Sequence, residues 1–510
     1  MKKNLPIGMQ TFEDLSKYNC VYVDKTEDIY RMISNGHIYF LSRPRRFGKS
    51  LLISTIEAVF QGRKELFEGL YIYDKWDWTQ QNPVIRMDFC GISHRTTEGL
   101  NSSLLHFIDN IAKKYSISLR NHDVIGKFAE LVTTIHKITG RYVVVLIDGY
   151  DLPVTDNISN EKVRDENHDY LYVFYQVLKG LDDHLEFIFI TGVSIYNPVN
   201  SVLDITTHYK NVATCGFTQE ELEKYFSEYI DETAAYHNWS REKLLDEIRK
   251  WYGGNSWNGK TWVYNPYSIL SFFAKKHFFN FWSSVGTSEF IIKSIKNRDN
   301  VSYLATISGM GLSALSVYEY SLEAGALLFQ NGYLTVKEQE SNSRSGTSYK
   351  VGVPNIEVGK SIWGDVASAY TGYSTGRVHQ DIFEMKQYLS KKNIAGFESR
   401  LSGLLEPVLK KQEAHALLLM LLKLLDFEVL KYEYWPKPEG DIAAVLHNAD
   451  MTIVTEIKYS TKPGAEGLLD NVMEQIHANK YYEKYADSKI ILMGVAYADK
   501  EVKCRLEELS

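Results

Sequence analysis

The stretch from residue 37 to 52, which reads HIYFLSRPRRFGKSLL, decides the fold of the first part of the chain. An apolar run over residues 38–41 is followed by a basic segment without strand pattern, and helical spacing resumes at Gly48-Lys49-Ser50. This order predicts a strand, a loop and a helix. In a phosphate-binding loop, backbone N–H groups at the helix N-terminus cradle phosphate oxygens, a lysine reaches the outer phosphates and the next hydroxyl ligates magnesium.

Lys49 and Ser50 are the two residue types that this chemistry needs, in the right order. One position departs from the usual motif, because Arg43 stands five residues before Gly48, where a glycine is expected. The alternative interpretation is a basic turn that caps a structural helix. We assign ATP binding to five residues of the loop and helix, and Ser50 is also assigned as a ligand of Mg²⁺. The five residues are Arg46, Gly48, Lys49, Ser50 and Leu51.

The composition is that of an ordinary soluble globular protein, with 44% apolar and 24% charged residues. At 510 residues the chain is expected to form roughly three domains. The amino-terminal MKKNLPIGMQ lacks the apolar segment of a signal peptide, and the longest apolar run, 416–425, is too short to cross a bilayer. Four widely spaced cysteines suggest neither a disulfide framework nor a zinc site, so a cytoplasmic protein without a membrane partner is expected. The net charge of −7 argues against a general coating of nucleic acid, although a local basic groove stays open.

Two more apolar strands are expected in the first part of the chain. Residues 143–147 show no alternation, which indicates a strand buried on both faces as in a parallel sheet, and this strand ends at Asp148. P-loop proteins use such an aspartate to hold the hydration shell of magnesium, whereas Asp148 alone would be interpreted as a turn cap. Together with Lys49 and Ser50 it predicts nucleotide binding. The next apolar run, LEFIFITGV, includes Thr191, which we assign to sensing the γ-phosphate at the carboxyl edge of the sheet.

These segments form a set that is familiar: LPIG, YVDKT, FLSRPRRFGKSLL, LIDGYD, FITGVS and CGFTQEEL. The set resembles uncharacterised bacterial proteins that join an AAA-ATPase-like domain to a carboxy-terminal nuclease-like domain, and the similarity runs over nearly the whole chain. In that family the loop also reads RPRRFGKS, so Arg43 is a family trait. The resemblance implies an α/β fold class: a P-loop AAA-like parallel sheet domain over 1–217, a helical and winged-helix middle region over 218–375, and an α/β PD-(D/E)XK nuclease-like domain over 376–510.

One departure from the family bears on catalysis. The family usually reads I-D-E-Y-D, whereas Gly149 occupies the acidic position here. The resemblance implies that this carboxylate positions the attacking water, so its loss is expected to leave binding intact and to slow hydrolysis by on the order of 10² to 10⁴. Asp151 is the candidate to substitute for it, and we assign Asp151 to the nucleotide site. The family's lysine after the second aspartate is also replaced, by Leu152.

The middle region is expected to be helical and then to form a hairpin. Thr218 followed three residues later by Glu221 predicts a capping box at a helix start. A helix and a two-stranded wing follow, with the hairpin turning between Ser341 and Gly346. A winged helix can read DNA, but in ATPase lids it is more often a packing and partner surface.

A second candidate site lies in GDIAAVLHNADMTIVTEIKYS. The segment predicts a hairpin that turns at residues 448–449, which places Asp441 opposite Glu456 and Lys458 on the same face. Two facing carboxylates repel each other unless a cation lies between them, so this face is a candidate Mg²⁺ site.

An aspartate followed on the next strand by Glu-X-Lys is the signature of the PD-(D/E)XK nuclease fold, and the resemblance covers this segment. It implies that Asp441 and Glu456 ligate Mg²⁺, that Lys458 orients or deprotonates the water attacking a phosphodiester, and that Gln475 lies near the substrate. The alternative is a retained fold in which Glu456 and Lys458 form a surface salt bridge without catalytic duty.

Two functions are therefore weighed against a third possibility, a structural protein that binds neither ATP nor Mg²⁺. The first is a Mg²⁺-dependent nuclease gated by ATP binding and acting on foreign or mobile DNA. The second is a switch or partner-binding protein that binds ATP, hydrolyses it poorly and carries an inactive nuclease fold. Many P-loop ATPases of this type assemble into rings, but no surface for a homo-oligomer can be recognised in the sequence.

Overall fold

The computed structural model describes residues 2–195, 202–282, 292, 310–311, 324–342, 346–408, 411–434, 442–448, 451–460, 462–485, 489–498 and 501–509. The chain divides into two compact units. The first takes in residues 1–282 and 308–357, and the second takes in residues 283–307 and 358–510. The division into three domains at residues 217 and 375 remains a prediction.

The first unit is built on a five-stranded sheet in the order β2-β3-β4-β1-β5, in which all neighbouring strands run parallel. The interior strand β3 is buried at every position, which is why its sequence shows no alternation. The predicted parallel sheet is therefore confirmed. Its strands are β1 (Ile38–Ser42), β2 (Val84–Asp88), β3 (Val143–Asp148), β4 (Leu185–Gly192) and β5 (Leu203–Asp204).

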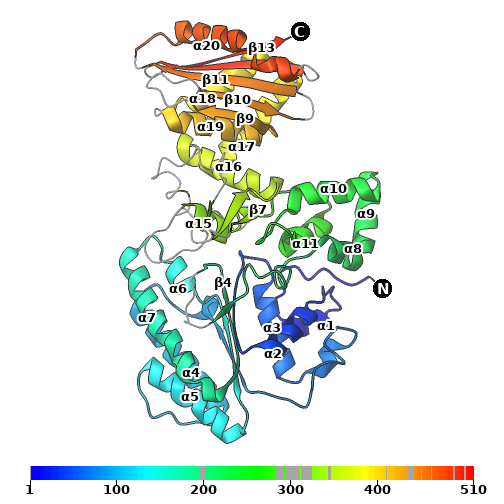
Figure 1. The fold of residues 1–510 in the computed structure, drawn as a ribbon, viewed down its shortest axis with the longest axis vertical. Helices are drawn as coiled ribbons and strands as arrows, with labels where there is room; N and C mark the ends of the chain where they lie inside the picture. Colours follow the sequence, from blue (N-terminus) through cyan, green and yellow to red (C-terminus); the bar gives the residue numbers. More distant parts are fainter. Residues whose placement is uncertain are drawn as a thin grey trace. The chain divides into compact units, whose positions relative to one another are not determined.

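Helices cover both faces of this sheet. Figure 1 shows α1, α2 and α3 on one side of it and α4, α5 and α7 on the other. The second group packs apolar side chains such as Leu104, Phe128 and Phe174 against the strands. The short α6 follows β3. These helices are α1 (Phe12–Lys17), α2 (Thr26–Asn35), α3 (Lys49–Phe60), α4 (Thr97–Lys114), α5 (Val124–Thr139), α6 (Leu152–Thr155) and α7 (Glu161–Gly180).

A helical region with an aromatic core follows the sheet within the first unit. Its first helix begins at the predicted capping box, since Thr218 accepts from the Glu221 N–H and the Glu221 side chain accepts from the Thr218 N–H. The helices pack around aromatic residues such as Phe226, Tyr252 and Phe272. They are α8 (Gln219–Tyr225), α9 (Ser227–His237), α10 (Arg241–Tyr252) and α11 (Pro266–Lys275).

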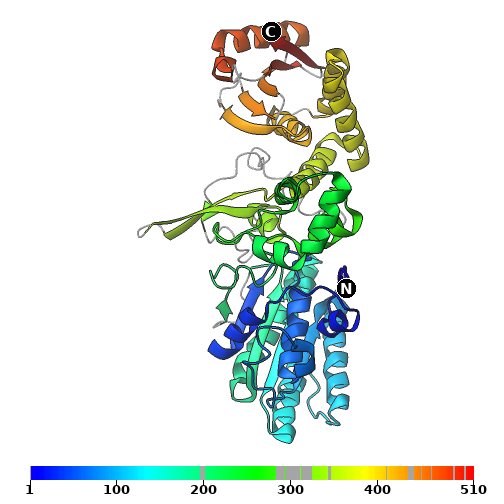
Figure 2. The same ribbon diagram turned by 90° about the vertical axis from the view of Figure 1, so that its right-hand side faces the viewer.

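The predicted wing is present as an antiparallel hairpin of β7 (Thr335–Asn342) and β8 (Gly346–Gly352), preceded by α15 (Ala324–Gln330). Asn342 pairs with Gly346, so the turn lies where the sequence predicted it. A short strand β6 (Met310–Gly311) pairs with β8. Figure 2 shows the yellow-green hairpin projecting away from the helices beside it.

The second unit contains a mixed five-stranded sheet in the order β13-β12-β11-β10-β9. Only β11 and β12 run parallel, and α20 connects them and packs on them. The strands are β9 (Glu428–Tyr434), β10 (Ile442–His447), β11 (Met451–Ser460), β12 (Lys489–Ala498) and β13 (Glu501–Leu509). The helices are α16 (Ile356–Thr371), which begins at the end of the first unit, α17 (Thr375–Ser390), α18 (Ile394–Leu405), α19 (Lys411–Leu424) and α20 (Ala465–Asn479).

The hairpin of β10 and β11 has a different register from the one predicted. Glu456 pairs with Ala443, so the expectation that Asp441 lies opposite Glu456 is wrong by two residues. The cause is the turn. Asn448 donates its N–H to the Met451 carbonyl at 3.0 Å and accepts from the Met451 N–H through Oδ1 at 2.9 Å, so Asn448 and Met451 face each other across the turn. None of the helices in the described part of the chain combines the length and the apolar character that crossing a bilayer requires.

Candidate functional site

The loop between β1 and α3 ends in an uncapped helix N-terminus. Gly48 is the N-cap of α3 with φ 94°, a left-handed conformation that glycine adopts without strain. No side chain caps the helix and no acidic residue lies in its first turn, whereas Thr96 and Asp123 cap α4 and α5. The first N–H groups of a helix have no acceptor within it and carry partial positive charge. This terminus is therefore suited to an anion.

Ser50 and Asp148 meet beside this terminus. The Ser50 hydroxyl lies near enough to the Asp148 carboxylate, at the carboxyl end of β3, to lower its pKa, and Asp148 is only 4% exposed. Burial raises the pKa of Asp148, while the Ser50 hydroxyl and the charge of Lys49 act in the opposite direction. Burial lowers the pKa of Lys49, and the negative charge of Asp148 partly offsets this effect. The Lys49 ammonium donates to the carbonyls of Arg43 and Pro44 at 2.9 Å each. The two predicted motifs are thus brought together.

Arg43 has a structural use that explains why it replaces a glycine. Its side chain is fully buried and lies over the Trp257 ring at 4.0 Å. Burial lowers the pKa of Arg43 to about 10, so the guanidinium stays charged at neutral pH. It donates to four main-chain carbonyls at 2.7 to 3.2 Å, those of Ser42, Thr206, Asn211 and Val212. Arg43 therefore ties the phosphate-binding loop to the segment that follows β5.

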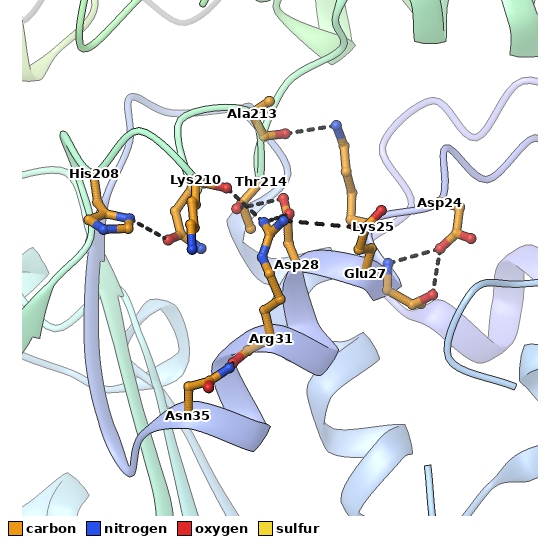
Figure 3. A network of polar contacts seen from close by, with 12 residues as sticks. Asp24, Lys25, Glu27, Asp28, Arg31, Asn35, His208, Lys210, Ala213 and Thr214 are labelled. Carbon is orange, nitrogen blue, oxygen red and sulfur yellow. Dashed lines mark hydrogen bonds and ion pairs between the residues drawn. The ribbon is translucent and has the colours of Figure 1, made fainter. Parts of the chain in front are cut away.

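That segment is held on its other side by a polar network, shown in Figure 3. Lys25 donates to the Ala213 carbonyl at 2.7 Å and forms an ion pair with Glu221 at 2.6 Å. Thr214 donates to Asp28 at 2.8 Å, and Arg31 pairs with Asp28 and donates to the Lys210 carbonyl at 2.8 Å. The YVDKT and CGFTQEEL segments thus meet in space and fix the loop that holds Arg43.

Two residues assigned to the nucleotide have structural partners. The Thr191 hydroxyl is fully buried and donates to the Leu41 carbonyl at 2.6 Å. The Asp151 carboxylate is also fully buried and accepts from the main-chain N–H groups of Val193 at 3.2 Å and Ser194 at 2.6 Å. Asp151 therefore holds the end of β4 and has its charge compensated by these donors.

The turn at Gly149 has a conformation that leaves little room for a side chain at this position. Gly149 has φ 68°, and a Cβ atom there would lie 2.7 Å from Leu152 Cδ1. Its N–H donates to the Thr191 carbonyl at 2.8 Å. A carboxylate at this position would therefore require both a strained backbone and a displaced Leu152 side chain.

Three further residues of the loop contact other elements of the first unit. Arg46, with φ 67°, lies over the Tyr267 ring of α11 at 3.9 Å, and Phe47 packs edge-on against Trp257. Arg45 is exposed and lies 3.4 Å from Asp156, which also accepts from His94 at 3.2 Å. The sequence did not point to these partners, because they lie about 110 to 220 residues away along the chain.

Comparison with known proteins agrees with this arrangement. A family model described as a predicted AAA-ATPase matches residues 6–200. An uncharacterised protein in the vnfD 5′ region of Azotobacter chroococcum mcd 1 is 34% identical over 374 residues, which cover 71% of this chain and 69% of that protein. The chain belongs to the same family as this protein, and its residues 6–200 form a predicted AAA-ATPase-like domain. Its AAA-ATPase-like domain suggests nucleotide binding, and neither comparison extends this to a nuclease function.

The AAA-ATPase-like domain has the groups that a nucleotide and a magnesium ion need. The hydroxyl of Ser50 and the carboxylate of Asp148 are oxygen ligands of the kind that Mg²⁺ prefers, and they lie near each other. The uncapped terminus at Gly48 offers main-chain N–H groups to a phosphate, and Lys49 offers a cation. These residues fit Mg²⁺ and a triphosphate.

The candidate residues of the second unit are only partly brought together. Glu456 is 1% exposed on β11, and Lys458 lies two residues along on the same face, as predicted. This is the face on which α20 packs, because Val454 and Val445 contact Val472 of that helix.

The Lys458 ammonium donates to Asn471 on α20, one turn before the half-buried Gln475. Asp441 lies outside the described residues. Among the side chains that the structure describes, no group of three or more His, Cys, Asp or Glu is placed to hold a metal ion. Asn471 is the contact that the sequence did not suggest.

Proposed function

We propose that the first unit binds ATP together with Mg²⁺ and hydrolyses it slowly, so that the protein works as a nucleotide-dependent switch. The observation that carries the proposal is the proximity of the Ser50 hydroxyl and the Asp148 carboxylate beside the uncapped N-terminus of α3. Burial disfavours both the Asp148 carboxylate and the Lys49 ammonium. A divalent cation and a triphosphate would give each of these charges a partner.

Slow hydrolysis is supported by the surroundings of the attacking water. Gly149 has no side chain to orient it, and Asp151 already accepts two main-chain N–H groups in the interior. General-base assistance is worth on the order of 10² to 10⁴ in rate, and the missing carboxylate at position 149 forfeits part of it. We therefore expect turnover well below about 1 s⁻¹, the lower end of ordinary enzyme rates.

Titration calorimetry with ATP and Mg²⁺, combined with thermal unfolding, tests this proposal. Bound nucleotide at a hundred times its dissociation constant is expected to stabilise the protein by about 2.7 kcal/mol. Lys49→Ala should abolish both signals. Lys127→Ala is the matched control, because Lys127 is a partly buried lysine of the same domain that is ion-paired with Asp109. Absence of binding by the unmodified chain, or equal binding by Lys49→Ala, would refute the proposal.

A second candidate function is a Mg²⁺-dependent nuclease in the second unit, with DNA as the partner and ATP as the gate. It is favoured by Glu456 and Lys458 on one face of β11, beside the helix that carries Asn471 and Gln475. In this proposal Glu456 and Asp441 hold the metal ion and Lys458 orients the attacking water.

Cleavage of DNA and RNA substrates with Mg²⁺ or Mn²⁺, with and without ATP, tests the nuclease proposal. Glu456→Gln and Asp441→Ala should each abolish cleavage while the ATP affinity of the first unit stays unchanged. Intact substrates under all conditions would remove this candidate and leave the switch.

A further inference from the structure

The proposed ATP site lacks an obvious carboxylate for the attacking water, since Gly149 has no side chain and Asp151 is committed to main-chain N–H groups. A third acid lies at the same edge of the sheet. Asp88 is the last residue of β2 and pairs in register with Asp148 at the end of β3. Side chains in register on neighbouring parallel strands project to the same face. Asp88 therefore projects to the face on which Asp148 meets Ser50.

Asp88 differs from Asp148 in its access to solvent. Asp148 is 4% exposed, whereas Asp88 is exposed to solvent. An acid that is accessible and that neighbours the magnesium-holding carboxylate is in the position to contact a water molecule next to a γ-phosphate. The buried Asp151 has no such access.

The charges around Cys90 show that several groups converge at this edge. Burial, together with Asp88 and Asp148, raises the pKa of the Cys90 thiol to about 11, while Arg45 of the phosphate-binding loop acts in the opposite direction. One thiol thus lies within electrostatic reach of two carboxylates and a loop arginine. Asp156 in turn contacts both Arg45 and His94. The rim beside Asp88 therefore carries cations that can compensate a phosphate.

We propose that Asp88 is the catalytic carboxylate that orients and deprotonates the water attacking the γ-phosphate, in the role that Gly149 cannot take. The inference rests on the proposed ATP site. In the step, the water oxygen forms a bond to the γ-phosphorus, and the bond from that phosphorus to the β,γ-bridging oxygen breaks. ADP leaves with the electron pair, and Asp88 accepts the water proton before passing it to solvent.

A purely structural role for Asp88 is the competing explanation. Asp88 caps the short 3₁₀ turn Phe89–Gly91, because its Oδ1 accepts from the Cys90 N–H at 2.9 Å. Asparagine caps such a turn as well as aspartate does but cannot accept a proton from water. Asp88→Asn therefore separates the two roles.

The experiment measures ATP affinity, single-turnover hydrolysis and the unfolding temperature of the full chain with Mg²⁺. For Asp88→Asn we expect the hydrolysis rate to fall roughly 10²-fold, with unchanged affinity and unchanged unfolding temperature. Asp77→Asn is the matched control. Asp77 is another exposed acid of the same domain that accepts from a local N–H group, that of Thr79, at 3.1 Å. It should leave all three quantities unchanged.

The outcomes separate this inference from the proposed function. If the unmodified chain does not bind ATP, the proposed function itself fails. If it binds ATP but Asp88→Asn hydrolyses at the unmodified rate, or the unmodified chain shows no hydrolysis at all, the role of Asp88 is refuted while ATP binding stands. A loss of affinity or unfolding temperature in parallel with the rate would also refute it, in favour of the capping role.

Discussion

At the level of single residues, Arg43 shows how the chain gives a new use to a position that usually holds glycine. Its guanidinium satisfies four carbonyls in the interior and stacks on Trp257. The planar fork of arginine can serve several acceptors and stack at the same time, whereas a lysine ammonium cannot. The residue therefore stabilises the loop by filling its interior, while Gly48 keeps the conformational freedom at the helix start.

We predict that Arg43→Lys lowers the free energy of unfolding of the first unit by about 3 kcal/mol, because buried carbonyls lose their donors and the stacking is lost. Denaturant unfolding measures this change. Arg63→Lys is the matched control, since Arg63 forms exposed ion pairs with Glu13 and Glu65 that are expected to contribute less than about 1 kcal/mol. Equal effects of the two substitutions would contradict the structural role of Arg43.

Glu357 is a second residue with a measurable signature. Its Oε1 accepts from the N–H groups of Phe281 at 2.8 Å and Trp282 at 3.0 Å, and its Oε2 accepts from Ser268 at 2.8 Å. Burial raises the pKa of Glu357 to about 7, against an ordinary value of 4.5. Because the folded state holds the proton more tightly than the unfolded state, the stabilisation is fully present below pH 4.5 and is lost as the pH rises through about 7.

We therefore predict that Glu357→Gln removes a pH dependence of stability. Between pH 5 and pH 8 the unmodified protein should lose up to about 3 kcal/mol relative to the variant, given 1.36 kcal/mol for each pKa unit. Glutamine keeps the acceptor for Phe281 and Trp282 and can donate to Ser268, so the fold is retained. Unfolding measured across this pH range checks the prediction, and parallel curves for the two proteins would contradict it.

At the level of helices and strands, predictions from the sequence were correct where neighbouring residues determine the structure. The strand, loop and helix around Gly48 were predicted correctly, because apolar runs and a glycine lie next to one another. The register at Glu456 was wrong by two residues, because Asn448 accepts from Met451 and moves the turn. The pairing of Asp88 with Asp148 could not be predicted, since it depends on the register of strands about 60 residues apart.

The packing of α20 on β12 makes an element-level prediction. A Cβ atom at Gly494 would lie 2.6 Å from Met473 Sδ and 3.2 Å from side-chain carbons of Leu469 and Val472. Gly494→Ala is therefore expected to destabilise the second unit by about 1 to 3 kcal/mol through overpacking.

The control is Gly467→Ala on α20 itself, where no atom lies within 4 Å of the added carbon. It should stabilise the helix by about 0.5 to 1 kcal/mol. Denaturant unfolding that showed Gly494→Ala to be neutral would mean that α20 does not approach the strand this closely.

At the level of the whole molecule, the phosphate-binding loop is connected to the helical region of its own unit through aromatic stacking. Arg46 lies over Tyr267, and Arg43 and Phe47 contact Trp257. Movement of the loop on nucleotide binding would therefore displace α11 and the loop that carries Trp257. For the proposed switch, these contacts are a physical route inside the first unit from the loop to the helices.

The division into two compact units leads to the last prediction. Calorimetry of the full chain should resolve two unfolding transitions, because each unit has its own core. ATP with Mg²⁺ should raise the midpoint temperature of the transition that Arg43→Lys lowers, and Gly494→Ala should lower the midpoint temperature of the other transition.

If ATP shifts only the first transition, nucleotide binding is not thermodynamically coupled to the second unit and the gated nuclease loses its support. If ATP also shifts the transition that responds to Gly494→Ala, linkage requires that the second unit change the ATP affinity in return. A lower ATP affinity in Gly494→Ala would then establish the coupling that gating needs.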